Sequence, residues 1–236
     1  MRRKIREIVR KFGFDIIRFK TEEMGLYPYQ DILKFISSKK PMLFDLGANT
    51  GQTIKDFREV FKSSTIHSFE PSPMTFKILK ENIAQMKNVH IWRLGVGSST
   101  TSLSLNENTY STMSSFLKIK NKSWGQIHNE TMVEVTTLDD FCEEQNIEKI
   151  DVLKIDVQGF ELEVLKGAKN SILKNKIGLL LFEVTFIEMY EGLPSFSSLY
   201  EFAVTHGFEL VSFYPIHYNK KNMAVYTDVL FKHKNY

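Results

Sequence analysis

A glycine-containing turn follows an acidic residue near the start of the chain's regular pattern. The run DLGANTG covers residues 45–51 and comes directly after the short apolar segment 42–44. Gly47 and Gly51 allow the backbone to approach a ligand where a strand leads into the N-terminus of a helix. In an open α/β sheet the ligand crevice lies outside the carboxyl ends of the strands, where Asp45 falls. The run therefore predicts a ligand site in preference to a purely structural turn.

A second acidic residue indicates what kind of ligand binds there. Glu70 ends the next predicted strand, about twenty residues beyond the turn, where a carboxylate can accept hydrogen bonds from both ribose hydroxyls. The pyrophosphate fingerprint G-x-G-x-x-G needs three glycines, and this turn has two. Asp45 would repel a pyrophosphate but can hold the amino group of a methionine moiety, directly or through water. The two motifs favour S-adenosylmethionine and disfavour a nicotinamide-dependent oxidoreductase.

Two more carboxylates end predicted strands. Asp156 closes segment 151–155 and is the first catalytic candidate, since a carboxylate at a strand end could take the proton of an acceptor hydroxyl. It could instead bind only the cofactor or cap the following helix. Glu183 closes the neighbouring segment 177–182, and the two acids could share a proton or a divalent cation. A metal is not favoured, because the sequence lacks a dense acidic cluster.

The remaining candidates lie in predicted loops. His128 and His217 have a reference pKa suited to a general base, and either could reach the site, although both rank behind Asp156. The polar run YSTMSSF, residues 110–116, is predicted to line or cover the acceptor pocket, since long loops at this edge of a sheet carry specificity.

The pattern of the chain predicts the elements that position these residues. From residue 41 onward, apolar segments alternate with helix-compatible ones, and segments 208–213 and 224–231 can pair antiparallel at the end. This alternation is typical of a doubly wound α/β sheet with one reversed strand. Segment 95–130 is interpreted as one strand, near 102–105, plus a long loop. Residues 1–40 form a helical extension and 41–236 the main domain.

The chain resembles the FkbM family of methyltransferases. The resemblance rests on FDLGANTGQT, FEPSP, VTTLDDF and above all IDVLKIDVQGFELEVLKGA at residues 150–168, and it covers residues 41 to about 185. It departs at Gln158, where Glu is frequent, and at Phe160, where a small residue is frequent. The resemblance implies a Rossmann-like seven-stranded methyltransferase sheet, mostly parallel with one reversed strand and with helices on both faces.

The resemblance also implies site residues and an activity. It implies S-adenosylmethionine, with its methionine and ribose side at Asp45, Gly47, Asn49 and Gly51, its ribose at Glu70, and its adenine bordered by Ser72, Leu94 and Gly95. The acceptor it implies is a hydroxyl of a sugar or glycan precursor, as in polysaccharide biosynthesis. Two alternatives remain open: methylation of a macrolide or other secondary metabolite, and a binding module that keeps the cofactor but has lost turnover.

Composition and charge limit the possible partners. The net charge of +3 comes from residues 1–11, which hold six basic side chains and one acidic one, so a broad nucleic-acid-binding face is not expected. Segment 4–12 predicts a short amphipathic helix that packs on the main domain or, alternatively, touches a membrane surface. The longest apolar run, 177–182, is too short to span a bilayer, and no secretory signal is apparent. The single cysteine, Cys142, fits a cytoplasmic protein.

Overall fold

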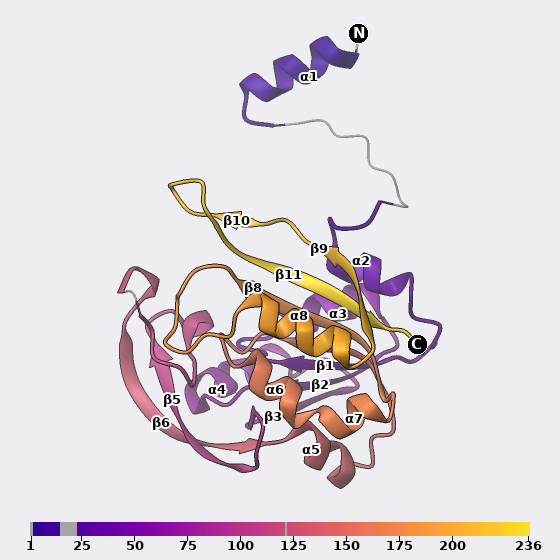
Figure 1. Ribbon diagram of the computed structural model, residues 1–236, viewed down its shortest axis with the longest axis vertical. Coiled ribbons are helices and arrows are strands. Elements are labelled where there is room, and N and C mark those ends of the chain that lie inside the picture. Colours follow the sequence, from indigo (N-terminus) through magenta and orange to yellow (C-terminus); the bar gives the residue numbers. More distant parts are fainter. Residues whose placement is uncertain (1, 15–22, 121) are drawn as a thin grey trace.

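The computed structural model describes residues 2–14, 23–120 and 122–236. Figure 1 shows a central sheet with helices on both faces, a second small sheet at one side, and helix α1 (Arg2–Lys11) away from the rest. The carboxyl edge of the central sheet carries the residues predicted to do chemistry.

The central sheet has the strand order β10-β11-β8-β7-β1-β2-β3, and β9 also pairs with β11. Strands β1, β2, β3, β7 and β8 are parallel, whereas β11 runs antiparallel to β8. The mostly parallel sheet with its reversed strand is therefore confirmed, with the two-residue strand β10 as an eighth member. The strands are β1 (Met42–Leu46), β2 (Thr65–Phe69), β3 (Val89–Trp92), β7 (Ile150–Ile155), β8 (Ile177–Thr185), β9 (Phe208–Phe213), β10 (His217–Tyr218) and β11 (Ala224–His233).

The central strands are covered on both faces, which explains their continuous apolar sequences. All six residues of β7 are buried, and its side chains alternate between two cores: Leu153 belongs to one and Val152 to the other. Because β1 lies beside β7, the turn after β1 and Asp156 after β7 meet at the same edge. The order of the strands thus brings together two motifs that lie far apart in the sequence.

Helices from different parts of the chain cover the two faces. Apolar residues of α5, α6, α7 and α8 share a core with Leu153, and those of α2, α3 and α4 share the core on the opposite face. Thr137 caps α5 by accepting a hydrogen bond from the Asp140 amide at 2.9 Å, as its sequence predicts. The helices are α2 (Pro28–Leu33), α3 (Gln52–Val60), α4 (Pro73–Asn82), α5 (Leu138–Glu144), α6 (Glu161–Gly167), α7 (Lys169–Leu173) and α8 (Phe196–Thr205).

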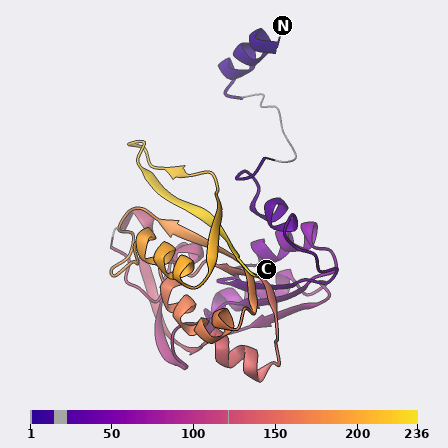
Figure 2. The same cartoon turned by 45° about the vertical axis from the view of Figure 1, so that its right-hand side comes forward.

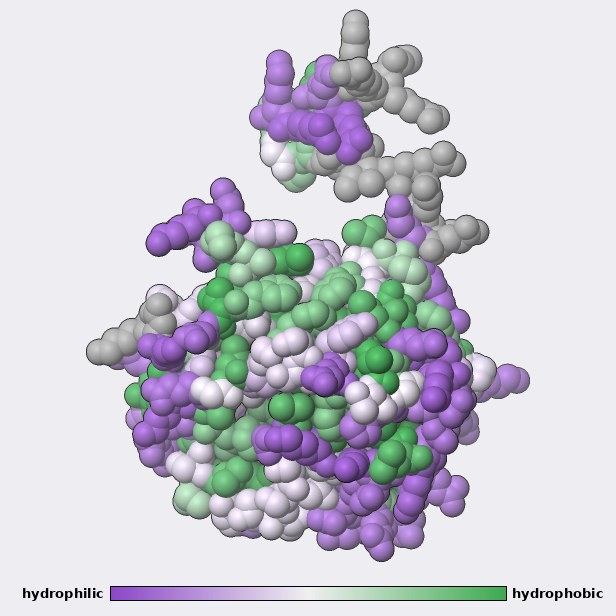
Figure 3. All heavy atoms as spheres, viewed as in Figure 1, coloured by the Kyte–Doolittle hydropathy of each residue, from purple (hydrophilic) through white to green (hydrophobic). Residues whose placement is uncertain are grey.

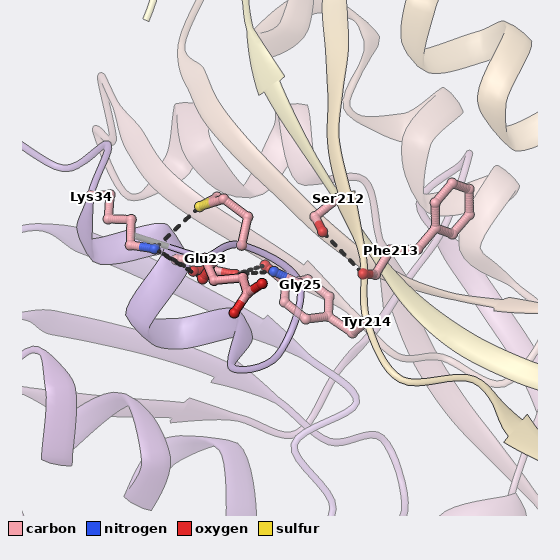
Figure 4. Close-up of polar contacts among 8 residues, drawn as sticks. Glu23, Gly25, Lys34, Ser212, Phe213 and Tyr214 are labelled. Atoms are coloured by element: carbon pink, nitrogen blue, oxygen red, sulfur yellow. Dashed lines mark hydrogen bonds and ion pairs between the residues drawn. The ribbon is translucent and has the colours of Figure 1, made fainter. Parts of the chain in front are cut away.

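The segment that begins at residue 23 is fixed to the body through Asp31. Its buried carboxylate accepts hydrogen bonds from the Gly25 amide at 2.7 Å and the Tyr214 hydroxyl at 3.3 Å, and it pairs with Lys34 at 2.9 Å. Figure 4 shows Glu23, Gly25 and Lys34 close to Tyr214, which follows strand β9. Since Ile32 of α2 is fully buried in the core, α2 packs as part of the body.

Helix α1 forms as predicted, but it does not pack on the main domain. Ile8 is 57% exposed and Phe12 75% exposed, and Figure 2 shows the helix separated from the body as in Figure 1. The expectation that its apolar face is docked is therefore wrong. Amphipathic periodicity predicts which side of a helix is apolar, but it cannot say which surface covers that side.

A second sheet takes up part of the region predicted to be one strand and a long loop: the predicted strand near 102–105 forms, residues 109–126 connect two strands, and two further strands flank them. It contains β4 (Gly95–Val96), β5 (Thr101–Asn108) and β6 (Ile127–Thr136) in the order β4-β6-β5. The first half of β5 is mostly exposed, whereas Asn106, Glu107 and Asn108 in its second half are buried and hydrogen-bonded. The connection between them carries two single 3₁₀ turns, η1 (Ser111–Met113) and η2 (Lys122–Trp124).

Candidate active site

A cavity of about 370 Å³ opens at the carboxyl edge of the central sheet. The ends of β1, β2, β7 and β8 form its floor, and the segment around η1 and η2 lies across it. The wall contains Leu46, Gly47, Asn49, Phe69, Glu70, Pro71, Leu94, Gly95, Val96, Leu105, Ser111, Thr112, Met113, Ser114, Ser115, Phe116, Trp124, Asp156, Val157, Gln158, Glu183, Met189 and Tyr226. The cavity therefore lies where the glycine turn predicts a ligand.

The glycine turn at one end of the cavity is set by backbone contacts. Gly47 has a φ of +87°, and a Cβ built on it would lie 1.9 Å from the Asp156 carbonyl oxygen. Its amide and that of Ala48 both donate to the Phe69 carbonyl, at 3.0 and 2.8 Å. Only glycine allows this close approach of the turn to the end of β7.

Glu70 is held beside the turn by two backbone amides. Its carboxylate accepts hydrogen bonds from the amides of Asn49 at 3.0 Å and Ser72 at 2.9 Å, and it lines the cavity. Burial raises the pKa of Glu70 to about 7, although these two amides oppose the rise. A carboxylate fixed in this way fits the paired hydroxyls of a ribose, so this end of the cavity suits an adenosine moiety.

Asp45 lies behind the cavity wall. Its side chain is fully buried, neither oxygen has a hydrogen-bond partner within the described residues, and the nearest cation is Lys154 Nζ at 3.7 Å. Burial raises the pKa of Asp45 to about 6, with Lys154 opposing the shift. Asp45 does not form part of the cavity wall. Its link to the site is indirect, because Lys154 lies near both Asp45 and Asp156.

Beside the glycine turn, Asp156 presents a partly exposed carboxylate to the cavity. Its side chain is 37% exposed, one oxygen pairs with Lys154 Nζ at 3.0 Å, and the other accepts from Gln158 Nε2 at 2.8 Å. Burial opposes ionisation here, but Lys154 and the two hydrogen bonds outweigh it and hold the pKa of Asp156 below its usual range. Asp156 is therefore an ionised hydrogen-bond acceptor at neutral pH.

Glu183 lines the same cavity in the opposite protonation state. Burial raises the pKa of Glu183 to about 9, and the nearby charges of Asp156 and Asp228 add to the effect. The side chain is protonated at neutral pH and can donate a hydrogen bond. The structure thus brings Asp156 and Glu183 to one cavity, with one acid poised to accept and the other to donate.

Gln158 connects Asp156 to the segment that lies across the cavity. Its side-chain oxygen accepts from the Tyr190 hydroxyl at 2.9 Å, and its backbone carbonyl accepts from Ser115 Oγ at 2.6 Å. An ionised glutamate could accept from Tyr190 but could not donate to Asp156. The residue at which the sequence departs from the family pattern therefore helps to keep Asp156 ionised.

The other departure, Phe160, lies outside the wall but supports it. Its ring packs against that of Phe116, a wall residue, with the centroids 5.0 Å apart. The bulky side chain thus fixes one side of the segment 110–116, which does line the cavity. At the other end of this segment, Ser111 Oγ lies 3.2 Å from the Asn49 side chain.

The structure separates the predicted site residues into two groups. Those in the cavity wall are Gly47, Asn49, Glu70, Leu94, Gly95, Asp156 and Glu183. Those outside it are Asp45, Gly51, Ser72 and His128. Gly51 is the N-cap of α3, and the hydroxyl of Ser72, expected near the adenine, is buried, donates to Glu107 and caps α4.

The two candidate histidines lie outside the cavity wall. His128 was expected in a loop but lies in strand β6, where its side chain is exposed and outside the wall. His217 is exposed on β10 and stacks on the wall residue Tyr226, with ring centroids 4.3 Å apart.

Several wall or supporting residues escape sequence reasoning. Lys154 carries a detectable signal, because a lysine inside a continuous apolar strand needs a buried partner. Trp124, Met189 and Tyr226 carry none, since each comes from a segment whose position depends on the tertiary fold. Within residues 2–14, 23–120 and 122–236, no group of three or more histidine, cysteine or acidic side chains is arranged to hold a metal ion.

This fold and this cavity define an S-adenosylmethionine-dependent methyltransferase. The chain belongs to the FkbM methyltransferase family: the family model described as "Methyltransferase FkbM domain" matches residues 45–210. The matched span includes the glycine turn, Glu70, Asp156 and Glu183, and it ends before Tyr226.

Named relatives are similar over different shares of the chain. The 2-O-methyltransferase NoeI of Sinorhizobium fredii is 23% identical over 81% of this chain and 82% of its own length. The hexuronic acid methyltransferase AglP of Haloferax volcanii is 28% identical over 61% of this chain, and the match spans 57% of that relative.

Solved structures support the fold. The M. capricolum protein TrmK, solved with S-adenosylhomocysteine, has a TM-score of 0.51 at 12% identity, covering 90% of this chain and 70% of that one. The METTL16 methyltransferase domain also has a TM-score of 0.51 at 12% identity, covering 97% and 78%. At this identity they show a shared architecture only.

Proposed function

We propose that this chain transfers the methyl group of S-adenosylmethionine to a hydroxyl of a neutral sugar or glycan precursor. The observation that carries the proposal is the Asp156 carboxylate, ionised, partly exposed and held in the cavity wall by Lys154 and Gln158. A carboxylate in that state can orient an acceptor hydroxyl and take its proton.

The residues of the cavity wall fit S-adenosylmethionine. We assign one group of them to the cofactor and another to the acceptor. S-adenosylmethionine supplies an activated methyl group whose transfer leaves a neutral thioether. We assign Glu70 to the ribose hydroxyls and the turn at Gly47 to the backbone of the methionine moiety, and Leu94 and Gly95 border the adenine side. Asp156 would orient the acceptor hydroxyl and take up its proton. Glu183, being protonated, donates to a neighbouring oxygen of the acceptor.

The charge of the cavity favours a neutral acceptor. Its acidic wall residues are Glu70, Asp156 and the protonated Glu183, and the described part of the chain contributes no lysine, arginine or histidine to the wall. An acceptor carboxylate would therefore lack a cationic partner and would approach ionised Asp156. Rings of Trp124 and Tyr226 in the wall offer apolar faces for the flat side of a sugar.

The names of the relatives support a hydroxyl acceptor and make the charge of the acceptor worth testing. One is a 2-O-methyltransferase and another acts on a hexuronic acid, which carries a carboxylate. We infer that this chain differs from the second in preferring the uncharged sugar. We also propose a cytoplasmic location, which the buried free thiol of Cys142 fits. Among the described residues, no helix is long and apolar enough to cross a bilayer.

The test uses the purified chain, S-adenosylmethionine and a set of matched acceptors. Neutral glycosides, the corresponding uronic acids and a macrolide alcohol are compared by mass spectrometry, and the methylated position is found by NMR. We expect a methyl ether on a neutral glycoside and much less product from its uronic acid. Product from the macrolide alone would replace the sugar by a secondary metabolite. Binding of S-adenosylhomocysteine without turnover on any acceptor would favour the binding-module alternative.

A further inference from the structure

Helix α1 combines basic and apolar side chains and leaves the apolar ones uncovered. Residues 2–11 read RRKIREIVRK, with six basic residues and one acidic residue. Ile5, Ile8, Phe12 and Phe14 are 46%, 57%, 75% and 70% exposed. A helix with this composition suits the interface of an anionic bilayer, where apolar side chains enter the lipid and basic ones meet the headgroups.

A second surface of the same character lies on the hairpin between β10 and β11. Tyr218 and Met223 are each 61% exposed at its tip, and Lys220 and Lys221 between them are exposed as well. The side chain of Asn219 accepts hydrogen bonds from the amides of Lys221 at 2.9 Å and Met223 at 3.1 Å. The tip is therefore an ordered turn that presents an aromatic ring, a methionine and two lysines together.

These two surfaces lie at the same end of the molecule. Figures 1 and 2 both place α1 and the β10–β11 hairpin at the upper end, and Figure 3 shows hydrophobic residues gathered on the part of the body that faces α1. Ile216, next to β10, is exposed as well. The hairpin leads directly into Tyr226, a wall residue of the cavity, so this end of the molecule adjoins the cavity.

We propose that α1 and the tip of the β10–β11 hairpin bind together to the surface of an anionic lipid bilayer. Charge complementarity selects this partner: both segments are basic, and segment 215–223 contains no acidic residue. The exposed apolar side chains select lipid over a nucleic-acid backbone, which would use the positive charges but would leave Phe12 and Met223 in water. Two weak contacts made by one chain reinforce each other.

The experiment measures association of the full chain with vesicles. Flotation is compared for vesicles of phosphatidylcholine alone and of phosphatidylcholine with phosphatidylglycerol, at low and high salt. We expect binding to the anionic vesicles only, weakened by salt because the attraction of exposed charges is screened.

Matched variants separate the two segments. The double variant Ile8→Glu with Phe12→Glu is expected to weaken vesicle affinity about tenfold or more, since it removes apolar contact and reverses local charge. Tyr218→Ser with Met223→Ser is expected to weaken it less, by several-fold. Met132→Glu, at a residue 65% exposed on strand β6, is the control and is expected to bind as the wild type does. A thermal shift with S-adenosylhomocysteine confirms that each variant is folded.

Three results would overturn the proposal. The first is absence of binding to anionic vesicles, and the second is equal loss of binding in all three variants. The third is a change in oligomeric state on substitution of Ile8 and Phe12 without vesicle binding, which would make α1 a contact between copies of the chain. None of these results bears on methyl transfer, which is measured with soluble acceptors.

Discussion

The two carboxylates that we assign to the cofactor and to the acceptor are held in different ways. Glu70, at what we call the cofactor end of the cavity, is fixed by the backbone amides of Asn49 and Ser72. Asp156, at what we call the acceptor end, is fixed by the side chains of Lys154 and Gln158.

The difference has a physical consequence. Backbone amides near a turn depend on chain geometry, so many sequences can fill the neighbouring positions and still bind the same cofactor. Side-chain partners change with each substitution, so the acceptor end can change its charge and shape while the cofactor end stays fixed. Substitutions at the two ends should therefore affect different measurements.

The largest expected effect is on turnover at Asp156. Asp156→Asn keeps the size of the side chain but removes its charge, and turnover should fall by about 10²-fold or more, the range for loss of a general base. Affinity for S-adenosylhomocysteine, measured by calorimetry, should change little. Weak cofactor binding with near-normal turnover at saturating cofactor would instead place Asp156 at the cofactor and shift the catalytic role to Glu183. Glu209→Gln, on exposed strand β9, is the control.

The next effect is on cofactor affinity at Glu70. Glu70→Ala should weaken S-adenosylhomocysteine binding by roughly 1–3 kcal/mol, the range for lost hydrogen bonds to a charged group. Calorimetry gives the dissociation constant, and Glu81→Ala, on the exposed side of α4, serves as the control. An unchanged constant would remove Glu70 from the ribose site.

A smaller effect concerns the stability of the protein without ligand. The pKa of Glu183 is raised to about 9 in the folded state, so its contribution to stability is full at acid pH and is lost as the pH rises from the unfolded value through about 9. Glu183→Gln should therefore raise the free energy of unfolding by roughly 1–3 kcal/mol at pH 8 and by little near pH 4.5. Denaturant melts at the two pH values measure it. Equal effects at both would contradict the raised pKa.

The smallest expected effect is a shift in the pH dependence of turnover when Gln158 is substituted. Gln158→Glu replaces the amide that donates to Asp156 by a second carboxyl group, so the pair should take up a proton more readily and the acid limb of turnover should move up by about one pH unit. Gln158→Ala removes the hydrogen bond without adding an acid and should move the limb less. Identical profiles for wild type and Gln158→Glu would show that Asp156 does not control the acid limb.

The cofactor end was the part that sequence could predict. The turn at 45–51, the acid at Glu70 and the alternation of apolar segments are local patterns, and β1, β2, β7 and β8 form where those patterns predict them. The family resemblance predicted the sheet, and the strand order confirms it. Gly47 and Glu70 line the cavity because their roles depend on positions next to the turn itself.

Other features depended on contacts that local pattern does not contain. Part of segment 95–130 forms a second sheet because β5 pairs with β6. In this pairing Leu103 lies opposite Val133, which is far along the chain. Asp45 occupies the predicted strand end, but the burial of its carboxylate depends on the neighbouring strand that brings Lys154 beside it.

The sequence by itself determined the class of sheet, the glycine turn and the acidic residues at the strand ends, because each follows from the nearest neighbours along the chain. Only the tertiary structure decided which acids meet, which of them is ionised, and that Tyr226 and Trp124 complete the wall. The physical reason is that a pKa and a cavity depend on groups brought together through space, and Asp156, Glu183 and Tyr226 come together only when β7, β8 and β11 pair.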